Sequence, residues 1–385
     1  MKSAICSLAI FALTATGWAQ SLPTAASQRR PELPAYFGVS PWTEGTHADA
    51  AIQSTGLLTI PMSTYSFLAT KDGKTYNGTI VGGSPFASPL PGPTPINAVV
   101  VPLKISVGSA TFDPTTGDSC NSTSTVSAFN SSPLVVATSI GFNGTAITAQ
   151  YIDGFRQAEF ASLVGGSGYT NPISYTTAPT YTISSSVVGR HGTTYSSGCS
   201  LLGILSYSWL DSYLRNTVMP SLTPGVISPT SFVIFLMKNV VESTSNHPSV
   251  STCCILGYHG ASGSPVQTYS AIEWDTTGLF GSSIHDASIA AHEIGEWMDD
   301  PLGTNPTPAW GGIGQVSSCQ SNLENGDPLT GTNMATVNGY HFQELAFFSW
   351  YYNAQSTPSL GTNGKFSGNG TFSGPAKVCP PGGTY

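Results

Sequence analysis

Residues 283–301 bring together residue types that could bind a metal ion and move a proton. They read SIHDASIAAHEIGEWMDDP. In a helix, His292 and Glu296 lie one turn apart on the same face, so an imidazole nitrogen and a carboxylate oxygen can converge on one cation. Zn²⁺ accepts both kinds of ligand. Glu293 lies on the flank of that face, where its carboxylate could take a proton from a water molecule activated by the metal.

A helix over this segment is predicted by its end signals and by its apolar spacing. Ser283 and Asp286 have the spacing of a capping box, and Pro301 ends the helix because it forces Asp300 out of the helical region. At about 100° per residue one face is apolar and should be buried; it consists of Ala290, Ile294, Trp297 and Met298. The opposite, outward face is polar and consists of His285, Ser288, His292, Glu296 and Asp299.

Two acidic residues, Asp299 and Asp300, stand at the end of this predicted helix, where they oppose the helix dipole. A hydrogen bond to His292 would compensate for this, and so would a bound Ca²⁺ ion. The alternative is that both carboxylates lie in water before Pro301.

The run HEIGE, from His292 to Glu296, resembles the H-E-x-x-H motif of zinc metallopeptidases with Glu in place of the second His. A third ligand must come from elsewhere in the chain. Glu324 follows Glu296 by 28 residues, a separation typical of metallopeptidases whose third ligand is a downstream Glu. Asp327 could be the ligand instead, or it could orient one.

The other histidines have less context. His259 lies in a Gly-rich loop before the helix and could be a metal ligand or stabilise a transition state, with Tyr258 as its rival for the second role. His285 lies two turns before His292, so both cannot easily bind one ion, and a capping or surface role is favoured for it. His341 heads an aromatic strand, for which a core or surface position is the default.

The chain carries little charge: of its 385 residues, 8 % are Asp, Glu, Lys or Arg, against roughly 25 % in an average globular protein. This argues against a disordered, charge-rich chain and against a coiled coil. Nucleic acid is not expected as a partner, because the net charge is −8 and no Lys/Arg cluster exists beyond Arg29–Arg30. A surface with few carboxylates loses little when acid protonates it, which indicates an acidic extracellular habitat.

Residues 1–19 have the pattern of a secretory signal peptide, with Lys2, a short apolar run and small residues before Gln20. We therefore expect a secreted, extracellular protein, or a periplasmic one, with no membrane segment after the signal is removed. Six cysteines remain, an even number that indicates disulfides; they are Cys120, Cys199, Cys253, Cys254, Cys319 and Cys379.

The rest of the chain divides by composition. Residues 20–50 are polar and Pro-rich, which predicts a linker or a propeptide-like arm. A β-rich part is expected over 51–230 and a part built around the metal-binding helix over 231–352. Residues 353–385 form a Gly/Pro/Ser-rich C-terminal segment.

Individual elements are predicted from apolar runs and turn residues. Strands are expected over 98–107, 134–137, 181–188 and 232–237, and helices over 151–160 and 206–219. Pro102 should place part of the first strand at an edge or bulge, and Pro220 should end the second helix. The continuous apolar run over 232–237 predicts a strand buried on both faces.

The region over 230–352 resembles the EXORDIUM, or phosphate-induced, secreted proteins of plants and their bacterial relatives. Residues 289–301 are similar to that family's AHELAE…NP segment, and four further segments follow the family's order. These segments are 232–241, 253–259, 323–327 and 337–352. The resemblance implies an extracellular protein with a zincin-like helix. The plant members are known for promoting growth and cell expansion rather than for an established peptidase activity.

The family's closing cysteine after 323–327 is replaced in this chain by Pro328-Leu329, so its disulfide pairing cannot be carried over. We expect Cys253 or Cys254 to pair with Cys319.

Together these features predict an α+β protein in which a β-rich N-terminal part precedes a zincin-like part built around a metal-binding helix. The expected function is zinc-dependent hydrolysis of peptide bonds in a peptide or protein substrate. His292, Glu296 and Glu324 would hold the metal and Glu293 would be the general base. The competing class is a non-catalytic cell-wall or signalling protein with a structural or vestigial metal site. A third class is an acid carboxyl peptidase with a Glu/Gln pair on a β-sandwich, for which no diagnostic pair stands out.

Overall fold

The computed structural model describes residues 33–40, 60–196, 199–352, 365–373 and 379. The signal peptide predicted over 1–19 lies outside these residues. Within the described part of the chain, no helix is both long enough and apolar enough to cross a membrane.

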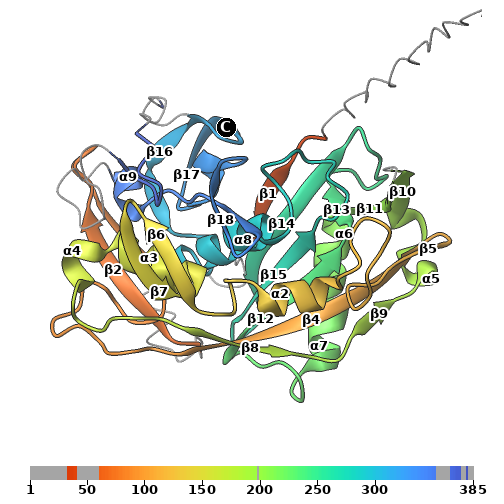
Figure 1. Ribbon diagram of the computed structural model, residues 1–385, viewed down its shortest axis with the longest axis horizontal. Coiled ribbons are helices and arrows are strands. Elements are labelled where there is room, and N and C mark those ends of the chain that lie inside the picture. Colours follow the sequence, from red (N-terminus) through yellow and green to blue (C-terminus); the bar gives the residue numbers. More distant parts are fainter. Residues whose placement is uncertain (1–32, 41–59, 197–198, 353–364, 374–378, 380–385) are drawn as a thin grey trace, which may run out of the picture. The chain divides into compact units, whose positions relative to one another are not determined.

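The largest structural element is an eleven-stranded mixed sheet (Figure 1). Its main path runs β10-β11-β13-β14-β15-β12-β4-β5, while β1 pairs with β14, and β8 and β9 pair with β4. The strands β13, β14, β15 and β12, which follow residue 230, lie between β10-β11 and β4-β5, which precede it, so the two parts expected from composition share one sheet. The strands are β1 Tyr36–Ser40, β4 Ile96–Val107, β5 Ala110–Phe112, β8 Ile173–Thr177, β9 Tyr181–Ile183, β10 Gly192–Ser196, β11 Leu201–Ser206, β12 Ser231–Lys238, β13 Val240–Ser243, β14 Cys253–Ser262 and β15 Gln267–Trp274.

The strand β12 shows how the sheet is covered on both faces. Phe232 and Ile234 belong to one hydrophobic core, and Val233 and Phe235, which point the opposite way, belong to a second. The strand pairs in parallel with β4 and β15, and every one of its residues is buried. The prediction of a strand buried on both faces is therefore confirmed.

Different helices cover the two cores (Figure 1). Residues of α8 pack in the core with Phe232, with the Trp297 and Phe232 rings stacked at a centroid distance of 3.7 Å. Residues of α6 and η2 pack in the other core with Val233. The helices are α2 Thr125–Ser131, α3 Tyr151–Glu159, α4 Ala161–Val164, α5 Ser185–Val188, α6 Tyr207–Tyr213, α7 Met219–Leu222, α8 Ala287–Asp299 and α9 Phe348–Tyr352, with short turns η1 Gly189–His191, η2 Leu214–Val218 and η3 Asp327–Leu329.

The described residues also form four two-stranded hairpins, and two of them enclose α8. This helix contacts β14 and β15 of the main sheet and also contacts β3 and β19 of the hairpins. All its residues are buried, so the expectation of an outward polar face is wrong. The hairpin strands are β2 Met62–Leu68 with β3 Thr75–Val81, β6 Thr138–Phe142 with β7 Thr145–Ala149, β16 Pro306–Ile313 with β17 Val316–Asn322, and β18 Asn333–Val337 with β19 Tyr340–Gln343.

The helix α8 begins at Ala287, four residues after Ser283, and ends at Asp299 as expected. Asp286 is its N-cap, with φ 44° and a side chain that accepts from the amide of Ala287. The positive φ turns the chain sharply, so the residues before Asp286 cannot continue the helix. The sequence alone does not show this turn, because Asp is compatible with both a cap and the first turn.

Two other helix predictions have different outcomes. The helix over 151–160 is confirmed as α3. The helix expected over 206–219 continues through α6, η2 and α7 to Leu222, past Pro220. The wider π turn of η2 lies directly before Pro220, where it changes the i→i−4 hydrogen-bond pattern that a proline would otherwise break.

The strand predictions were partly wrong. Residues 134–137 form a turn, and the strand predicted over 181–188 ends at Ile183 and is followed by α5. Pro102 is not on an edge strand, because β4 pairs on both sides. Residues 96–100 of β4 pair with β8 and residues 103–105 pair with β9. Pro102 lies between these two paired stretches, so the N–H that it lacks is not needed for pairing with β8 or with β9.

Two carboxyl groups are buried within the sheet. Glu242 in β13 and Glu273 in β15 are each 0 % exposed, and neither carboxyl makes a well-oriented hydrogen bond within the described residues. Burial raises the pKa of both groups well above the ordinary value, although the amides of Glu242 itself and of Asn239 oppose this shift. Both carboxyls are therefore protonated in the folded protein at pH values where the unfolded chain would ionise them.

Replacing Glu273 by Gln should stabilise the protein at neutral pH. The pKa of Glu273 in the folded protein lies above the ordinary 4.5, so above pH 4.5 the unfolded chain releases this proton more readily than the folded protein does. The free energy of unfolding therefore falls as the pH rises from 4.5 toward the folded-state pKa, and Gln, which does not ionise, removes this loss. We expect the Tm of Glu273→Gln to rise by about 2 °C or more at pH 7 and to change by about 1 °C or less at pH 4, measured by calorimetry.

The control for this experiment is Asp72→Asn on the exposed β2–β3 turn. There a small burial effect is outweighed by hydrogen bonds from Tyr76 and Lys74, so the pKa of Asp72 is lowered and the substitution should reduce Tm at pH 7. A Glu273→Gln protein that is less stable than wild type at pH 7 would show that this carboxyl is ionised and paired.

Candidate metal centre

The side chains of His292 and Glu296 meet on α8 as predicted. His292 Nε2 lies 3.0 Å from Glu296 Oε1. Two neighbours hold the imidazole in place: the Phe37 ring stacks on it with centroids 3.8 Å apart at 13°, and Gly326 packs against it. A Cβ at Gly326 would lie 2.5 Å from His292 Nδ1, so a residue without a side chain is required at this close approach.

The imidazole of His259 reaches the same place from β14. Its Nδ1 lies 3.4 Å from Glu293 Oε2 and 3.7 Å from Glu296 Oε2, and its Nε2 lies 3.1 Å from the carbonyl oxygen of Asp300. Burial lowers the pKa of His259 to about 4, so the ring is neutral at neutral pH. Because a carbonyl oxygen only accepts, Nε2 carries the proton and Nδ1 presents its lone pair to the two carboxyls.

The segment after β17 supplies Glu324. Its Oε2 lies 3.9 Å from His259 Nε2, and its carboxyl is hydrogen-bonded to that of Glu296. Asn322 donates to Glu324 Oε1 at 2.6 Å, and the hydroxyl of Tyr351 donates to its backbone carbonyl. These bonds fix both the backbone and the side chain of Glu324 beside the cluster.

The carboxylate of Asp327, at the start of η3, lies beside the His292 imidazole. Its Oδ1 is 3.6 Å from His292 Nε2. The side-chain amides of Gln315 and Gln320 both donate to this carboxylate, Gln320 at 3.1 Å. Asp327 therefore lies close to His292 in an orientation set by two glutamines that the sequence analysis did not identify.

Six of the seven predicted site residues thus meet in one buried cluster: His259, His292, Glu293, Glu296, Glu324 and Asp327. Two sets of three within it could hold a metal ion, each with ligand atoms within 4.8 Å of one another. The sets are His259–Glu296–Glu324 and His292–Glu293–Glu296. Glu296 is common to both, so it is the residue on which either arrangement depends.

The seventh residue, Tyr258, does not join the cluster. Neighbouring residues of a strand point to opposite faces, and Tyr258 lies in the other core, with its ring edge-on to Tyr207 and Tyr269. It cannot stabilise a charge that develops at α8, and that part of the prediction is wrong.

Burial controls the charges of the cluster. It raises the pKa of Glu293 and Glu324 well above ordinary values and that of Asp327 to about 6. Burial also acts to raise the pKa of Glu296, but the neighbouring imidazoles lower it overall. For His292, burial acts to lower the pKa, and Glu296 together with Asp327 raises it well above 6.5. Without a metal, the centre of the cluster is therefore an ion pair of His292 and Glu296, with the raised pKa values of Glu293 and Glu324 favouring their protonated forms.

The donor atoms fit a cation. His292 Nε2 and Glu296 Oε1 approach to 3.0 Å, yet both ring nitrogens of His292 and Oε1 of Glu293 lack a well-oriented hydrogen bond within the described residues. Buried polar atoms are rarely left so, and a cation bound between the imidazole and the carboxyls would provide the missing partner. Mixed imidazole and carboxylate donors suit Zn²⁺ and related transition metals, whereas Ca²⁺ takes oxygen ligands.

Both Asp299 and Asp300 are buried, and neither is held by His292. Asp299 forms an ion pair with Arg156 at 2.5 Å and accepts from Asn325 at 2.7 Å. Asp300 accepts from the backbone amides four and five residues further on. Arg156 also donates to the carbonyl of Met298, so its charge compensates the C-terminal end of α8. The Ca²⁺ ion considered for these carboxylates is therefore not required.

A cavity of about 310 Å³ opens onto the cluster from the carboxylate side, where Glu296, Glu324 and Asp327 line it. Glu293 is 0 % exposed and does not line it. The strand β1, whose Tyr36, Phe37 and Gly38 also line the cavity, pairs in parallel with β14. Glu293 lies so close to β14 that a Cβ at Gly257 would be 2.8 Å from its Cγ. The edge of β14 beside the predicted base is thus covered by β1.

The cysteine pairs differ from the expected one. They are Cys120–Cys199, Cys253–Cys254 and Cys319–Cys379. Cys319 therefore bonds to the C-terminal segment, and its predicted pairing with Cys253 or Cys254 is wrong. Sequence separation could not indicate this, because six cysteines allow 15 pairings. Three pairs at bonding distance are compatible with an extracellular protein.

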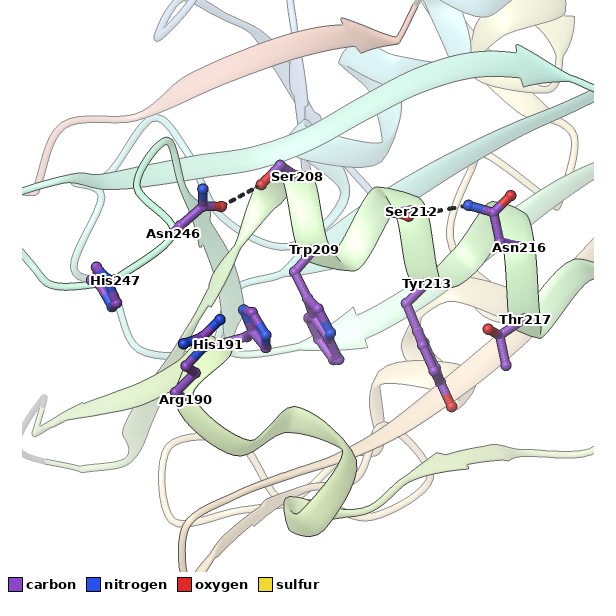
Figure 2. A pocket seen from close by; sticks show the side chains of 10 residues that line it. All are labelled: Arg190, His191, Ser208, Trp209, Ser212, Tyr213, Asn216, Thr217, Asn246 and His247. Carbon is purple, nitrogen blue, oxygen red and sulfur yellow. Dashed lines mark hydrogen bonds between the residues drawn. The ribbon is translucent and has the colours of Figure 1, made fainter.

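A larger cavity, of about 560 Å³, lies along α6 and contains none of these residues (Figure 2). Trp209 and Tyr213 stand one turn apart there with nearly parallel rings 5.4 Å apart, and His191 stacks on Trp209. No carboxyl group lines this cavity, so it offers neither an acid/base pair nor a metal site of the kind found at α8.

No protein-family model, curated protein or solved structure matches the chain. The proposals below therefore depend on the geometry of the cluster and its chemistry.

The substitution Gly326→Ala should weaken metal binding without unfolding the protein. The backbone at this position has φ −83°, which alanine adopts freely, but its methyl group would displace the His292 ring. We expect the affinity for Zn²⁺, measured by titration calorimetry, to fall by about tenfold or more. The control is Gly92→Ala, where nothing lies within 4 Å of the added carbon. Equal affinities in the two variants would show that His292 is not a ligand.

Proposed function

We propose that the chain is a secreted, zinc-dependent hydrolase that cleaves peptide bonds. The observation that carries this proposal is that His292 and Glu296 lie 3.0 Å apart while the buried ring nitrogens of His292 have no well-oriented hydrogen bond within the described residues, with the carboxyl of Glu293 beside the same cluster. A structural metal site requires ligands only. Hydrolysis also requires a group near the metal that can accept a proton, and Glu293 is that group.

The ligands that we propose are His292, Glu296 and Glu324, which leave one position open. Glu324 is preferred to Asp327 as the third ligand because its carboxyl contacts that of Glu296, whereas Asp327 is held by two glutamine amides. Zinc bound there would supply a Lewis acid that lowers the pKa of a water molecule and polarises a carbonyl group.

The remaining residues position the base and the ligands. A cation bound in the cluster would lower the raised pKa of Glu293, so that its carboxylate would accept the proton of the attacking water and then give it to the departing amine. His259 faces both Glu293 and Glu296 through Nδ1, so it orients the base relative to the metal ligand. Asp327 lies against His292 and fixes the ring that binds the ion.

The position of β1 also has a place in this proposal. It occupies the edge of β14 next to Glu293, and Phe37 of β1 stacks on His292. An extended peptide bound at a sheet edge forms the same kind of backbone hydrogen bonds that β1 forms here. We propose that the described arrangement is a resting form, in which β1 occupies the place of the substrate.

The second candidate is a non-catalytic extracellular protein with a structural metal, as in the class implied by the EXORDIUM resemblance. The observation in its favour is that Glu293 is 0 % exposed and lies away from the cavity. In that case β1 would be a permanent part of the sheet.

The substitution Glu293→Gln should abolish hydrolysis and leave zinc in place. Gln keeps the size of the side chain but cannot accept a proton, so the rate should fall by about 10²-fold or more while the zinc content stays unchanged. Hydrolysis of a fluorogenic casein and the zinc content by mass spectrometry measure the two effects, with Glu273→Gln as the matched control. Activity in neither form would support the non-catalytic protein, and activity that survives chelators would point to a carboxyl peptidase.

Cutting the chain after β1 should raise the activity. A protease recognition sequence inserted after Ser40 would allow β1 to leave the edge of β14 once it is cut. We expect the cut protein to hydrolyse casein about tenfold or more faster than the uncut insertion variant, because Glu293 becomes accessible. Unchanged activity after complete cutting would show that β1 does not block the site.

A further inference from the structure

We propose a second metal site, formed by His285, Asp286 and His341, that binds Zn²⁺ or a similar transition-metal ion. Asp286 Oδ2 lies 2.7 Å from His341 Nδ1 and 3.6 Å from His285 Nε2. One ligand atom from each of the three residues lies within 4.8 Å of the others, and the two imidazole rings are 3.8 Å apart. This inference does not depend on the proposed peptidase activity.

The donor set determines the class of metal. Two imidazole nitrogens and one carboxylate oxygen match Zn²⁺, Ni²⁺ and Cu²⁺ and do not match Ca²⁺ or Mg²⁺, which prefer oxygen ligands. Bonds of about 2.0–2.2 Å place two ligands of a tetrahedral ion about 3.2–3.6 Å apart. The separation of 3.6 Å between Asp286 and His285 already fits, and that of 2.7 Å to His341 needs only a small rotation of the side chains.

The backbone around Asp286 holds its carboxylate in place for this role. Asp286 Oδ1 accepts from the amides of Ala287 and His341, which leaves Oδ2 for the two imidazoles. The residue has φ 44°, a conformation that a non-glycine residue adopts only when its surroundings impose it. Asp286 Oδ1 thus caps the N-terminus of α8, and Asp286 Oδ2 faces the imidazole rings of His285 and His341.

A simple hydrogen bond does not account for the whole arrangement. The bond from His341 to Asp286 explains one ring, but His285 Nε2 is too far from the same oxygen, at 3.6 Å, to form another. Its imidazole nevertheless packs against that of His341 with its nitrogen toward the carboxylate. A shared cation explains why both rings face one oxygen.

Solvent access distinguishes this site from the cluster at His292. The three side chains are 26 %, 20 % and 28 % exposed, so an ion can enter directly and water can complete its coordination. The ligands come from the chain before α8 and from β19, which are 55 residues apart at Asp286 and His341. A metal here would join the start of α8 to the β18–β19 hairpin and hold the helix that carries His292.

The test compares the zinc content of the wild-type chain with that of His285→Gln. The side chain of His285 makes no hydrogen bond within the described residues, so its replacement should leave the fold intact. After dialysis against micromolar Zn²⁺, mass spectrometry should find one zinc ion fewer per chain in the variant. If both proposed sites bind zinc, the contents should be two ions in the wild type and one in the variant. If the proposed centre at His292 binds none, they should be one and zero, so the expected difference is one ion in either case. The control His247→Gln should match the wild type.

A second measurement makes the result independent of folding. Without metal, the Tm of His285→Gln should equal that of the wild type, and with Zn²⁺ the wild type should gain more in Tm than the variant does. His341→Gln should give the same loss of one ion. Equal zinc contents in the wild type, His285→Gln and His341→Gln would overturn the proposal.

Discussion

Carboxyl groups that lie out of reach of water are the constraint on which this structure depends. Of the 20 Asp and Glu residues in the chain, 13 are buried within the described part, although such residues are normally exposed. Each buried carboxyl must be protonated, hydrogen-bonded, paired with a cation or bound to a metal, since an isolated charge in the interior is too costly. Asp299 has Arg156, Asp300 has backbone amides, and Glu242 and Glu273 keep their protons.

The cluster at α8 is the place where none of these solutions is complete. Four carboxyls face two imidazoles, and His292 can balance only one negative charge. In acid the carboxyls are protonated and the fold tolerates them. As the pH rises toward the raised pKa values of Glu293, Glu324 and Asp327, a divalent cation would become a favourable partner. The fold and the metal therefore have opposite pH preferences: buried neutral acids favour low pH, and metal ligands must lose their protons.

Local patterns predicted which side chains of α8 lie together, because i and i+4 spacing is a property of the helix itself. His292, Glu293 and Glu296 needed no knowledge of the fold, and Glu324 could be found by its separation from them. Burial could not be found in this way. The polar side of α8 has the composition of a surface, and it is an interior because Phe37 of β1, His259 of β14 and Gly326 pack against it.

Residues that act through tertiary contacts were also beyond prediction. Phe37 lies in a Pro-rich arm with no periodic pattern, and Arg156 is a single cation 143 residues before its partner. His285 and His341 are unremarkable in sequence and become a group only because β19 pairs beside the start of α8. Tyr258 was misjudged because a Gly-rich stretch was taken for a loop. In a strand, its side chain must point away from that of His259.

The two ends of α8 are fixed in different ways, and the difference bears on function. The C-terminal end is held inside the protein by the ion pair of Asp299 with Arg156, whose side chains are both fully buried. The N-terminal end is held by Asp286 and two histidines that water can reach. The proposed ligands His292 and Glu296 lie between these two ends, so the contacts at both ends fix the part of the helix that carries them.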